Sequence, residues 1–163
     1  MAKNKVNIKM DFIDKLEADI KKFSHSVNSS LAHKMTEELE KEYNYVINNF
    51  YSEYTPKYYQ RHNPGGLYKT YRRYYKNPHN KIYYGGIEIT EEKMYGDYHN
   101  SRIDVLNSFL NGYHGHPRLG IYSSINTYDH MIKYRDFLAN NINYYVPDAL
   151  SEARKQKYHI LNF

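Results

Sequence analysis

The sequence predicts an α+β fold, in which a small antiparallel sheet with a long β-hairpin packs against two long helices and a short helix. Apolar residues recur at spacings of three and four over about residues 11–53 and again over about 127–157, as they do in amphipathic helices. Between these stretches, about residues 67–90 hold two β-prone runs separated by a turn signal. A chain of 163 residues with this order of elements is expected to form a single domain, 1–163.

The chain begins with apolar residues that alternate with polar ones over residues 6–12, and this period of two predicts a short strand. From residue 11 the apolar period becomes that of a helix and continues to Phe50. The polar run SHSVNSS at 24–30 either divides this segment into two helices or forms an exposed side of one. The helix is expected to end before Pro56, because the residue preceding a proline disfavours the helical conformation.

The hairpin is predicted from two runs rich in tyrosine and isoleucine on either side of NPHN at residues 77–80. Within the second run, the pair Gly85-Gly86 indicates a bulge or a close approach of another group to the backbone. Residues 91–100 are polar, and we expect them to form a loop.

The C-terminal part is predicted to be helical. A short helix over residues 103–110 should stop at Gly112. Thr127 is expected to cap the last long helix, and Pro147 should kink or restart it. The final segment KQKYHILNF either stays loose or docks on a neighbouring subunit.

Composition excludes several classes of protein. The chain has no cysteine, so it forms no disulfide and no thiolate metal site. It contains no run of 18 apolar residues, and its first residues are charged, so we expect neither a transmembrane helix, nor a secretory signal, nor a membrane partner.

Residues 51–84 form the most unusual stretch, with ten tyrosines, seven Lys or Arg and one acidic residue, Glu53. The charges within this stretch sum to +6. Since the net charge of the whole chain is +5, the remaining residues sum to −1, and the basic character is local. Such a patch suits an anionic partner, either nucleic acid or an acidic protein surface; the alternative is a solvated strand face.

At the centre of this stretch, Arg72 and Arg73 are flanked by Tyr71, Tyr74 and Tyr75. Arginine and tyrosine can pair phosphates and stack bases, so nucleic-acid binding through residues 51–84 is one hypothesis. The same residue types are enriched in protein–protein interfaces, and an oligomeric interface is the more economical interpretation.

No catalytic motif is present. His114 and His116 could hold a metal only with further ligands that no spacing supplies, so we expect hydrogen-bonded imidazoles and no metal. Ser123 and Ser124 lack the G-x-S-x-G frame of a hydrolase nucleophile, and the glycine pairs lack phosphate-loop framing. The sequence therefore predicts neither an enzyme nor a cofactor.

One segment resembles a known family. Tyr54, Pro56, Tyr59, Arg61 and Leu67, placed between a long helix and a hairpin, resemble the motif of the tail-completion or neck proteins of long-tailed bacteriophages, also called minor head–tail joining proteins. The chain departs from this motif at His62, where the family carries threonine, and in the insertion NPGG at 63–66. The loop GYHGHPRLGIYSS resembles a glycine-rich element of these proteins, without the tryptophan that usually lies near it.

The resemblance implies a structural protein without catalysis, which assembles as a homo-oligomeric ring at the head–tail junction of the virion after synthesis in the host cytoplasm. Its partners would be other neck, connector or tail proteins, with at most nonspecific contact with DNA. Tyr71–Tyr75 would then serve as interface residues, and a second set would fix the turn from the long helix into the hairpin: Tyr54, Pro56, Tyr59 and Arg61.

Overall fold

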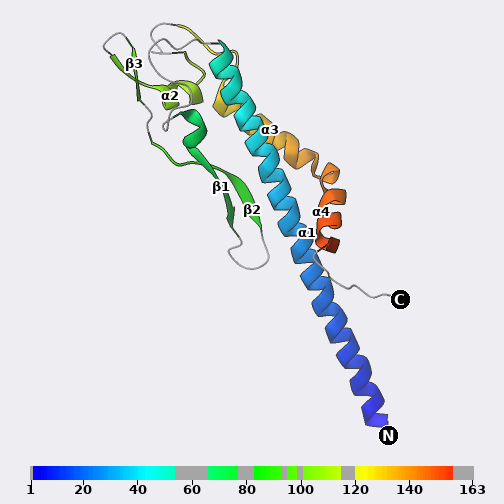
Figure 1. Ribbon diagram of the computed structural model, residues 1–163. Helices are drawn as coiled ribbons and strands as arrows, with labels where there is room; N and C mark the ends of the chain where they lie inside the picture. The colour runs from blue at the N-terminus through cyan, green and yellow to red at the C-terminus, as the bar shows by residue number, and fades with distance from the viewer. Residues whose placement is uncertain are drawn as a thin grey trace. The chain divides into compact units, whose positions relative to one another are not determined.

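The structure is a computed structural model, and it describes residues 2–53, 66–76, 83–92, 95–98, 101–114 and 120–155 (Figure 1). A long helix, shorter helices and two-stranded antiparallel pairing confirm the α+β class. The elements in chain order are α1 (Ala2–Glu53), the 3-10 turn η1 (Leu67–Lys69), β1 (Tyr71–Lys76), β2 (Tyr84–Ile89), β3 (Tyr95–Tyr98), β4 (Ser101–Asp104), α2 (Val105–Leu110), α3 (Thr127–Asn140), the 3-10 turn η3 (Ile142–Tyr144) and α4 (Val146–Lys155).

Helix α1 is continuous over 52 residues, so the strand predicted at residues 6–12 is wrong. Four alternating apolar residues are too few to specify a strand, and α1 contains no glycine or proline that would stop a helix from extending through them. The polar run 24–30 also lies inside α1, and Ser26 within it is buried, so this run neither breaks the helix nor forms a purely exposed side. The helix ends at Glu53, as expected ahead of Pro56.

Strands β1 and β2 form the predicted hairpin. The N–H of Thr90, just after β2, donates to the carbonyl of Thr70, just before β1, at 2.7 Å, so the two strands are antiparallel. The first strand is shorter than predicted, because Leu67–Lys69 is a 3-10 turn in which the Thr70 hydroxyl donates to the Leu67 carbonyl. The predicted turn at 77–80 lies outside the described residues.

A second antiparallel pair, β3 with β4, overturns the loop predicted at residues 91–100. Tyr95 lies opposite Asp104, and Tyr98 lies opposite Ser101. Each strand has only four residues, which is too short for an apolar alternation to be visible in a polar sequence.

Helix α2 confirms the predicted short helix, although it begins at Val105 and Ile103 belongs to β4. Asp104 caps this helix, because its side chain accepts from the N–H of Asn107. Gly112 follows the helix with φ +73°, a conformation that glycine adopts without strain. Helix α3 is capped by Asn126 and not by the predicted Thr127.

Pro147 lies in the first turn of α4, where its missing N–H has no helical partner to lose. The helix predicted over 127–157 is therefore divided by η3 and restarted, which is one of the two outcomes expected at this proline. The segment 156–163 lies outside the described residues.

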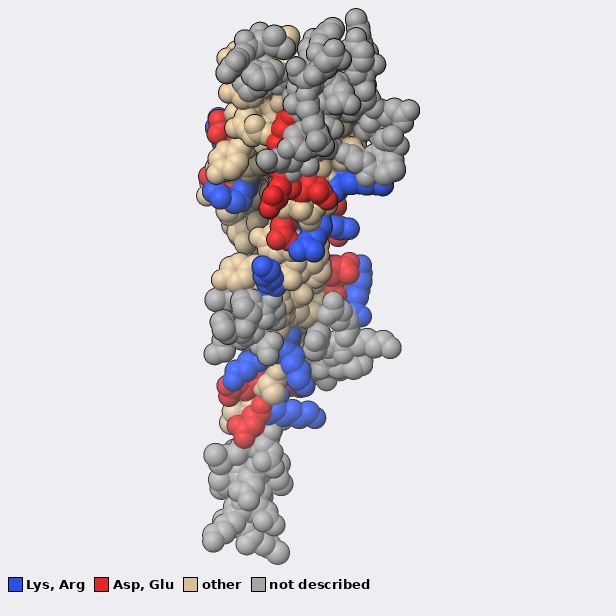
Figure 2. Space-filling model, turned by 90° about the vertical axis from the view of Figure 1, so that its left-hand side faces the viewer, with Lys and Arg blue, Asp and Glu red and all other residues tan. Residues whose placement is uncertain are grey.

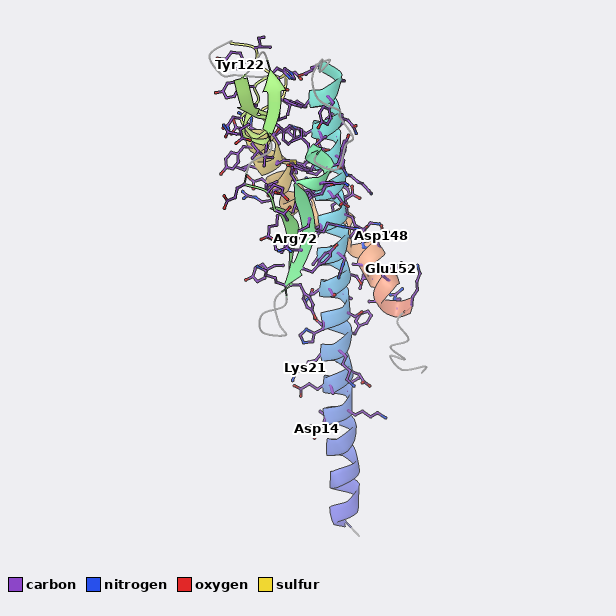
Figure 3. The ribbon with its side chains drawn as sticks, turned by 60° about the vertical axis from the view of Figure 1, so that its left-hand side comes forward. Asp14, Lys21, Arg72, Tyr122, Asp148 and Glu152 are labelled. Atoms are coloured by element: carbon purple, nitrogen blue, oxygen red, sulfur yellow. The ribbon has the colours of Figure 1, made fainter. Side chains whose placement is uncertain are left out.

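The chain divides into two compact units. Unit 1 comprises residues 1–34, 75–84 and 142–163, and unit 2 comprises residues 35–74 and 85–141. In unit 1, α4 runs alongside α1 (Figures 1 and 3), and the Lys34 ammonium lies 3.5 Å from the carboxylate of Asp148.

Unit 2 holds a hydrophobic core that includes buried tyrosines, as expected from a composition rich in tyrosine. Phe109 of α2 is fully buried, with its ring centroid 5.3 Å from that of Phe50 and 5.7 Å from that of Tyr43, both edge to face. The core consists of Tyr43, Val46, Ile47, Phe50, Tyr51, Leu67, Val105, Leu106 and Phe109.

Among the helices described, none is both long and apolar enough to cross a membrane.

Candidate functional site

Both arginines of the hairpin face carboxylates of the same chain. Arg72 contacts Glu88 on the neighbouring strand, with its Nε and Nη2 atoms 2.9 and 2.8 Å from Oε2. The Nε atom of Arg73 lies 3.3 Å from Glu40 of α1, and its Nη1 atom lies 4.0 Å from Glu37. Basic and acidic side chains accordingly lie next to one another on the face shown in Figure 2. The local excess of positive charge in the sequence is thus offset in space by acidic residues of β2 and α1.

The tyrosines of β1 are also engaged within the chain. The Tyr71 hydroxyl donates to the Asn44 side chain at 2.7 Å, and burial raises the pKa of Tyr71. The Tyr75 ring lies over His33 with centroids 3.8 Å apart. The structure thus gathers Tyr71–Tyr75 on one strand, while Tyr54, Pro56, Tyr59 and Arg61 lie outside the described residues.

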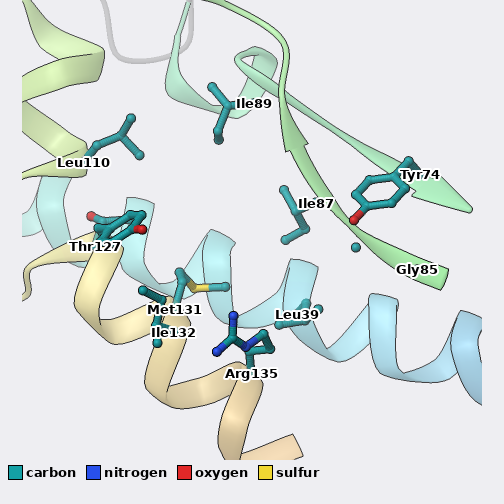
Figure 4. A pocket seen from close by; sticks show the side chains of 12 residues that line it. Leu39, Tyr74, Gly85, Ile87, Ile89, Leu110, Thr127, Met131, Ile132 and Arg135 are labelled. Carbon is teal, nitrogen blue, oxygen red and sulfur yellow. The ribbon is translucent and has the colours of Figure 1, made fainter. Parts of the chain in front are cut away.

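An apolar groove lies in unit 2, where β1, β2, α1, α2 and α3 meet (Figure 4). Its cavity has a volume of about 340 Å³. Aliphatic and methionine side chains from four elements form half of its lining: Leu39, Ile87, Ile89, Leu110, Met131 and Ile132. The other half comes from the hairpin and α3: Tyr74, Gly85, Gly86, Thr127, Tyr128 and Arg135. We call this the apolar groove.

Local sequence explains how the groove is built. A side-chain carbon added to Gly86 would lie 2.9 Å from the Tyr74 ring, so only glycine lets this ring lie against β2. The close approach predicted at Gly85-Gly86 is therefore confirmed. On the opposite side, Met131 and Ile132 of α3 face the groove (Figure 4). Thr127 fixes the start of α3, because its buried hydroxyl donates to the Phe109 carbonyl at 2.7 Å.

Arg135 is the charged residue in this lining. Its guanidinium contacts the carboxylate of the next residue, Asp136, with Nη2 and Oδ1 2.7 Å apart, and both side chains are largely exposed. Exposed pairs of this kind contribute little to stability, so an incoming carboxylate can replace Asp136 at small cost. The groove combines an apolar surface with one exchangeable cation.

A polar cluster lies at the end of α1. Nε2 of His114 lies 3.0 Å from Oε2 of Glu53, the Ser123 hydroxyl donates to the same oxygen at 2.9 Å, and Ser124 donates to both carboxylate oxygens. Burial opposes ionisation of Glu53, but hydrogen bonds from Ser124, His114 and Ser123 outweigh it and lower its pKa to about 2.

The geometry of this cluster differs from that of a hydrolytic triad, in which the imidazole bonds the serine hydroxyl and the carboxylate orients the imidazole. Here the carboxylate of Glu53 contacts both the serines and His114. The hydrogen-bonded imidazole predicted for His114 is confirmed, and His116 lies outside the described residues. Within the described ranges, no group of three or more His, Asp or Glu side chains could hold a metal ion.

No family model, curated protein or solved structure matches the chain significantly. Sequence reasoning missed both the Glu53 cluster and the apolar groove. The partners of Glu53 lie 61 to 71 residues away, and no motif spacing joins them. The groove arises only when residues of β2, α2 and α3 converge in space.

Proposed function

We propose that this chain is a non-enzymatic virion structural protein, which assembles as a ring of copies and joins or completes the tail at the head–tail junction of a long-tailed bacteriophage. The observation that carries its assembly role is the apolar groove, a partly exposed apolar surface with one exchangeable cation. The basic hairpin, in contrast, is already engaged by acidic residues of its own chain. Exposed apolar patches commonly mark sites of protein–protein contact.

The position in the virion rests on the resemblance described above. The order of a long helix, a hairpin and C-terminal helices agrees with that of the neck proteins. The motif itself falls mainly on residues 54–61, between the end of α1 and η1.

Nucleic-acid binding through residues 51–84 is the alternative function, and the described contacts favour it less. To bind a phosphate, Arg72 must give up Glu88, and Arg73 must give up Glu40. Those carboxylates would then lie close to the phosphate and repel it.

The solution mass tests the assembly role against the alternative. Light scattering at about 50 mM and about 500 mM salt, with and without nonspecific DNA, separates the two, because phosphate binding weakens steeply with salt. A discrete multimer that ignores DNA supports the proposal. A monomer that binds DNA at the lower salt and releases it at the higher salt refutes it.

Placement in the virion needs its own experiment. A tagged copy, expressed in cells that produce the phage, should be found by gold labelling at the joint between head and tail of released particles. Label at the capsid faces or the tail tip, or its absence from particles, would contradict the proposed position.

A further inference from the structure

The N-terminal part of α1 carries a second apolar surface that faces solvent. Ile13 and Ile20 are 59% and 55% exposed, and Leu16 and Phe23 on the same side are partly buried. The spacing between these four residues is three, four and three, so they form one straight row along the helix. We call these four residues the α1 stripe.

Acidic residues border the α1 stripe on both sides. In helical projection, Glu17 and Asp19 lie next to the stripe on opposite flanks, whereas Lys21 and Lys22 lie further around the helix. Lys21 contacts Glu17 at 2.6 Å and Lys22 contacts Asp19 at 3.9 Å, both as exposed pairs within the helix; Lys21 is labelled in Figure 3. The α1 stripe is therefore an apolar row bordered by carboxylates, each in an exposed ion pair that a cation of another chain can replace at small cost.

The apolar groove has the complementary properties. It presents aliphatic side chains of β2 and α3, with the Arg135 cation among them. Amphipathic helices commonly bind such grooves through apolar anchors at positions i, i+3 and i+7, which is the spacing of Ile13, Leu16 and Ile20. Opposite charges at the edges of two apolar surfaces favour their association and fix its orientation.

We propose that the α1 stripe of one copy docks in the apolar groove of a second copy, where Arg135 exchanges Asp136 for Glu17 or Asp19 of the incoming helix. The proposed occupant is the same segment of a second copy, so the contact joins two identical chains through two different surfaces. This inference rests on the homo-oligomeric part of the proposed function. It makes the contact heterologous, and heterologous contacts generate closed rings or open filaments.

Disulfide trapping tests this contact directly, because the chain contains no cysteine of its own. Ile20 and Tyr128 are both exposed, at 55% and 65%, and Tyr128 lines the groove. The double variant Ile20→Cys, Tyr128→Cys should give a ladder of covalent multimers on mild oxidation. In the matched control, Tyr128 is kept and Ile121, which is 53% exposed and does not line the groove, is replaced by cysteine. A similar ladder from the control, or no ladder from the test variant, would overturn the proposal.

Mixing two defective variants gives an independent test. Ile20→Glu places a charge in the stripe, and Arg135→Glu repels the acidic edges of the incoming helix. Each variant alone should associate at least about tenfold more weakly than the wild type. Together they should form a 1:1 dimer, because the first keeps an intact groove and the second an intact stripe. If Ile20→Glu assembles like the wild type, the stripe is not the contact, and if the mixture stays monomeric, the head-to-tail arrangement is wrong.

These outcomes can be separated from the proposed function as a whole. Gold label at the head–tail joint together with failed trapping would overturn the docking mode and leave the virion role. Successful trapping without label on particles would support the docking mode and refute the position in the virion.

Discussion

Oε2 of Glu53 and Nε2 of His114 lie 3.0 Å apart, although 61 residues separate them in the chain. The C-terminal end of a helix carries a partial negative charge, which disfavours a carboxylate there. The ionised side chain of Glu53 is therefore stabilised by hydrogen-bond donors from elsewhere in the chain. His114, Ser123 and Ser124 supply them. This carboxylate therefore fastens residues on both sides of the 115–119 segment to the end of α1.

Neutralising this carboxylate should destabilise the protein and change its pH dependence. Because the pKa of Glu53 is lowered from its ordinary value of 4.5 to about 2, its contribution to the free energy of unfolding is complete above pH 4.5 and is lost as the pH falls through 2. We expect Glu53→Gln to have a free energy of unfolding about 1 kcal/mol lower than the wild type at pH 7. As the pH falls from 4.5 to 2, the variant should lose less stability than the wild type does. Urea unfolding at a series of pH values measures both effects.

A matched control for this prediction is Glu91→Gln, since Glu91 is exposed. It should change the stability at pH 7 by less than about 0.5 kcal/mol. If Glu53→Gln gave the wild-type acid profile, the hydrogen bonds at Glu53 would not be what holds its carboxylate ionised.

Truncating the central aromatic ring of unit 2 should be far more costly. Phe109 is 0% exposed and contacts Phe50 and Tyr43, so Phe109→Ala should lower the free energy of unfolding by about 3–5 kcal/mol. The control is Phe137→Ala, because Phe137 is 52% exposed and should cost less than about 1 kcal/mol. Equal losses in the two variants, measured by chemical denaturation, would contradict this description of the core.

Features with a local physical cause were predictable from the sequence. Pro147 restarts the C-terminal helix because a missing N–H is tolerated only in a first turn. Gly112 ends α2 through its positive φ, and α1 ends ahead of Pro56. The β1–β2 hairpin was likewise indicated by residue type and turn signals alone.

Features that depend on contacts distant in sequence were not predictable. The alternation at 6–12 favoured a strand, yet helix propagation from the following residues prevails there. The side chain of Asn126 caps α3, whereas the Thr127 hydroxyl donates to the Phe109 carbonyl, 18 residues earlier in the chain. The sequence predicted a basic patch suited to an anionic partner, or a solvated strand face. It did not indicate the carboxylates that meet Arg73, because Glu37 and Glu40 lie on α1 more than thirty residues earlier in the chain.

Two glycines with positive φ allow steric crowding to be separated from backbone strain. Gly112 has φ +73°, and an added side-chain carbon would lie 3.0 Å from Cα of Asn126, whereas Gly120 has φ +65° and nothing within 4 Å. Gly120→Ala should cost about 1 kcal/mol from the left-handed conformation alone. Gly112→Ala should cost at least about 1 kcal/mol more, because a backbone neighbour must also shift. Thermal unfolding of both variants checks the order, and equal costs would contradict it.

The cap of α3 can be assigned by substitution. Asn126 Oδ1 accepts from the N–H of Asp129 at 3.1 Å, so Asn126→Ala should lower stability by about 1 kcal/mol, while Asn126→Ser should retain most of it. Thr127→Ser keeps the hydroxyl that donates to Phe109 and serves as the matched control at the next position. If Asn126→Ser lowered stability as much as Asn126→Ala, the side chain of Asn126 would stabilise the protein through a contact other than the helix cap.

The pair between Arg72 and Glu88 decides how the basic hairpin should be understood. Its atoms lie 2.8 Å apart across two strands at exposed positions, where such pairs contribute about 0.2–1 kcal/mol. A double-mutant cycle of Arg72→Ala and Glu88→Ala should therefore give a coupling energy within that range, which falls as salt is added.

Glu88→Gln should in turn strengthen retention on DNA-cellulose at low salt, because it removes the carboxylate that holds the guanidinium. A coupling energy near zero, with wild-type DNA retention already at the level of Glu88→Gln, would mean that Arg72 is available to phosphates and would return the hairpin to the nucleic-acid hypothesis.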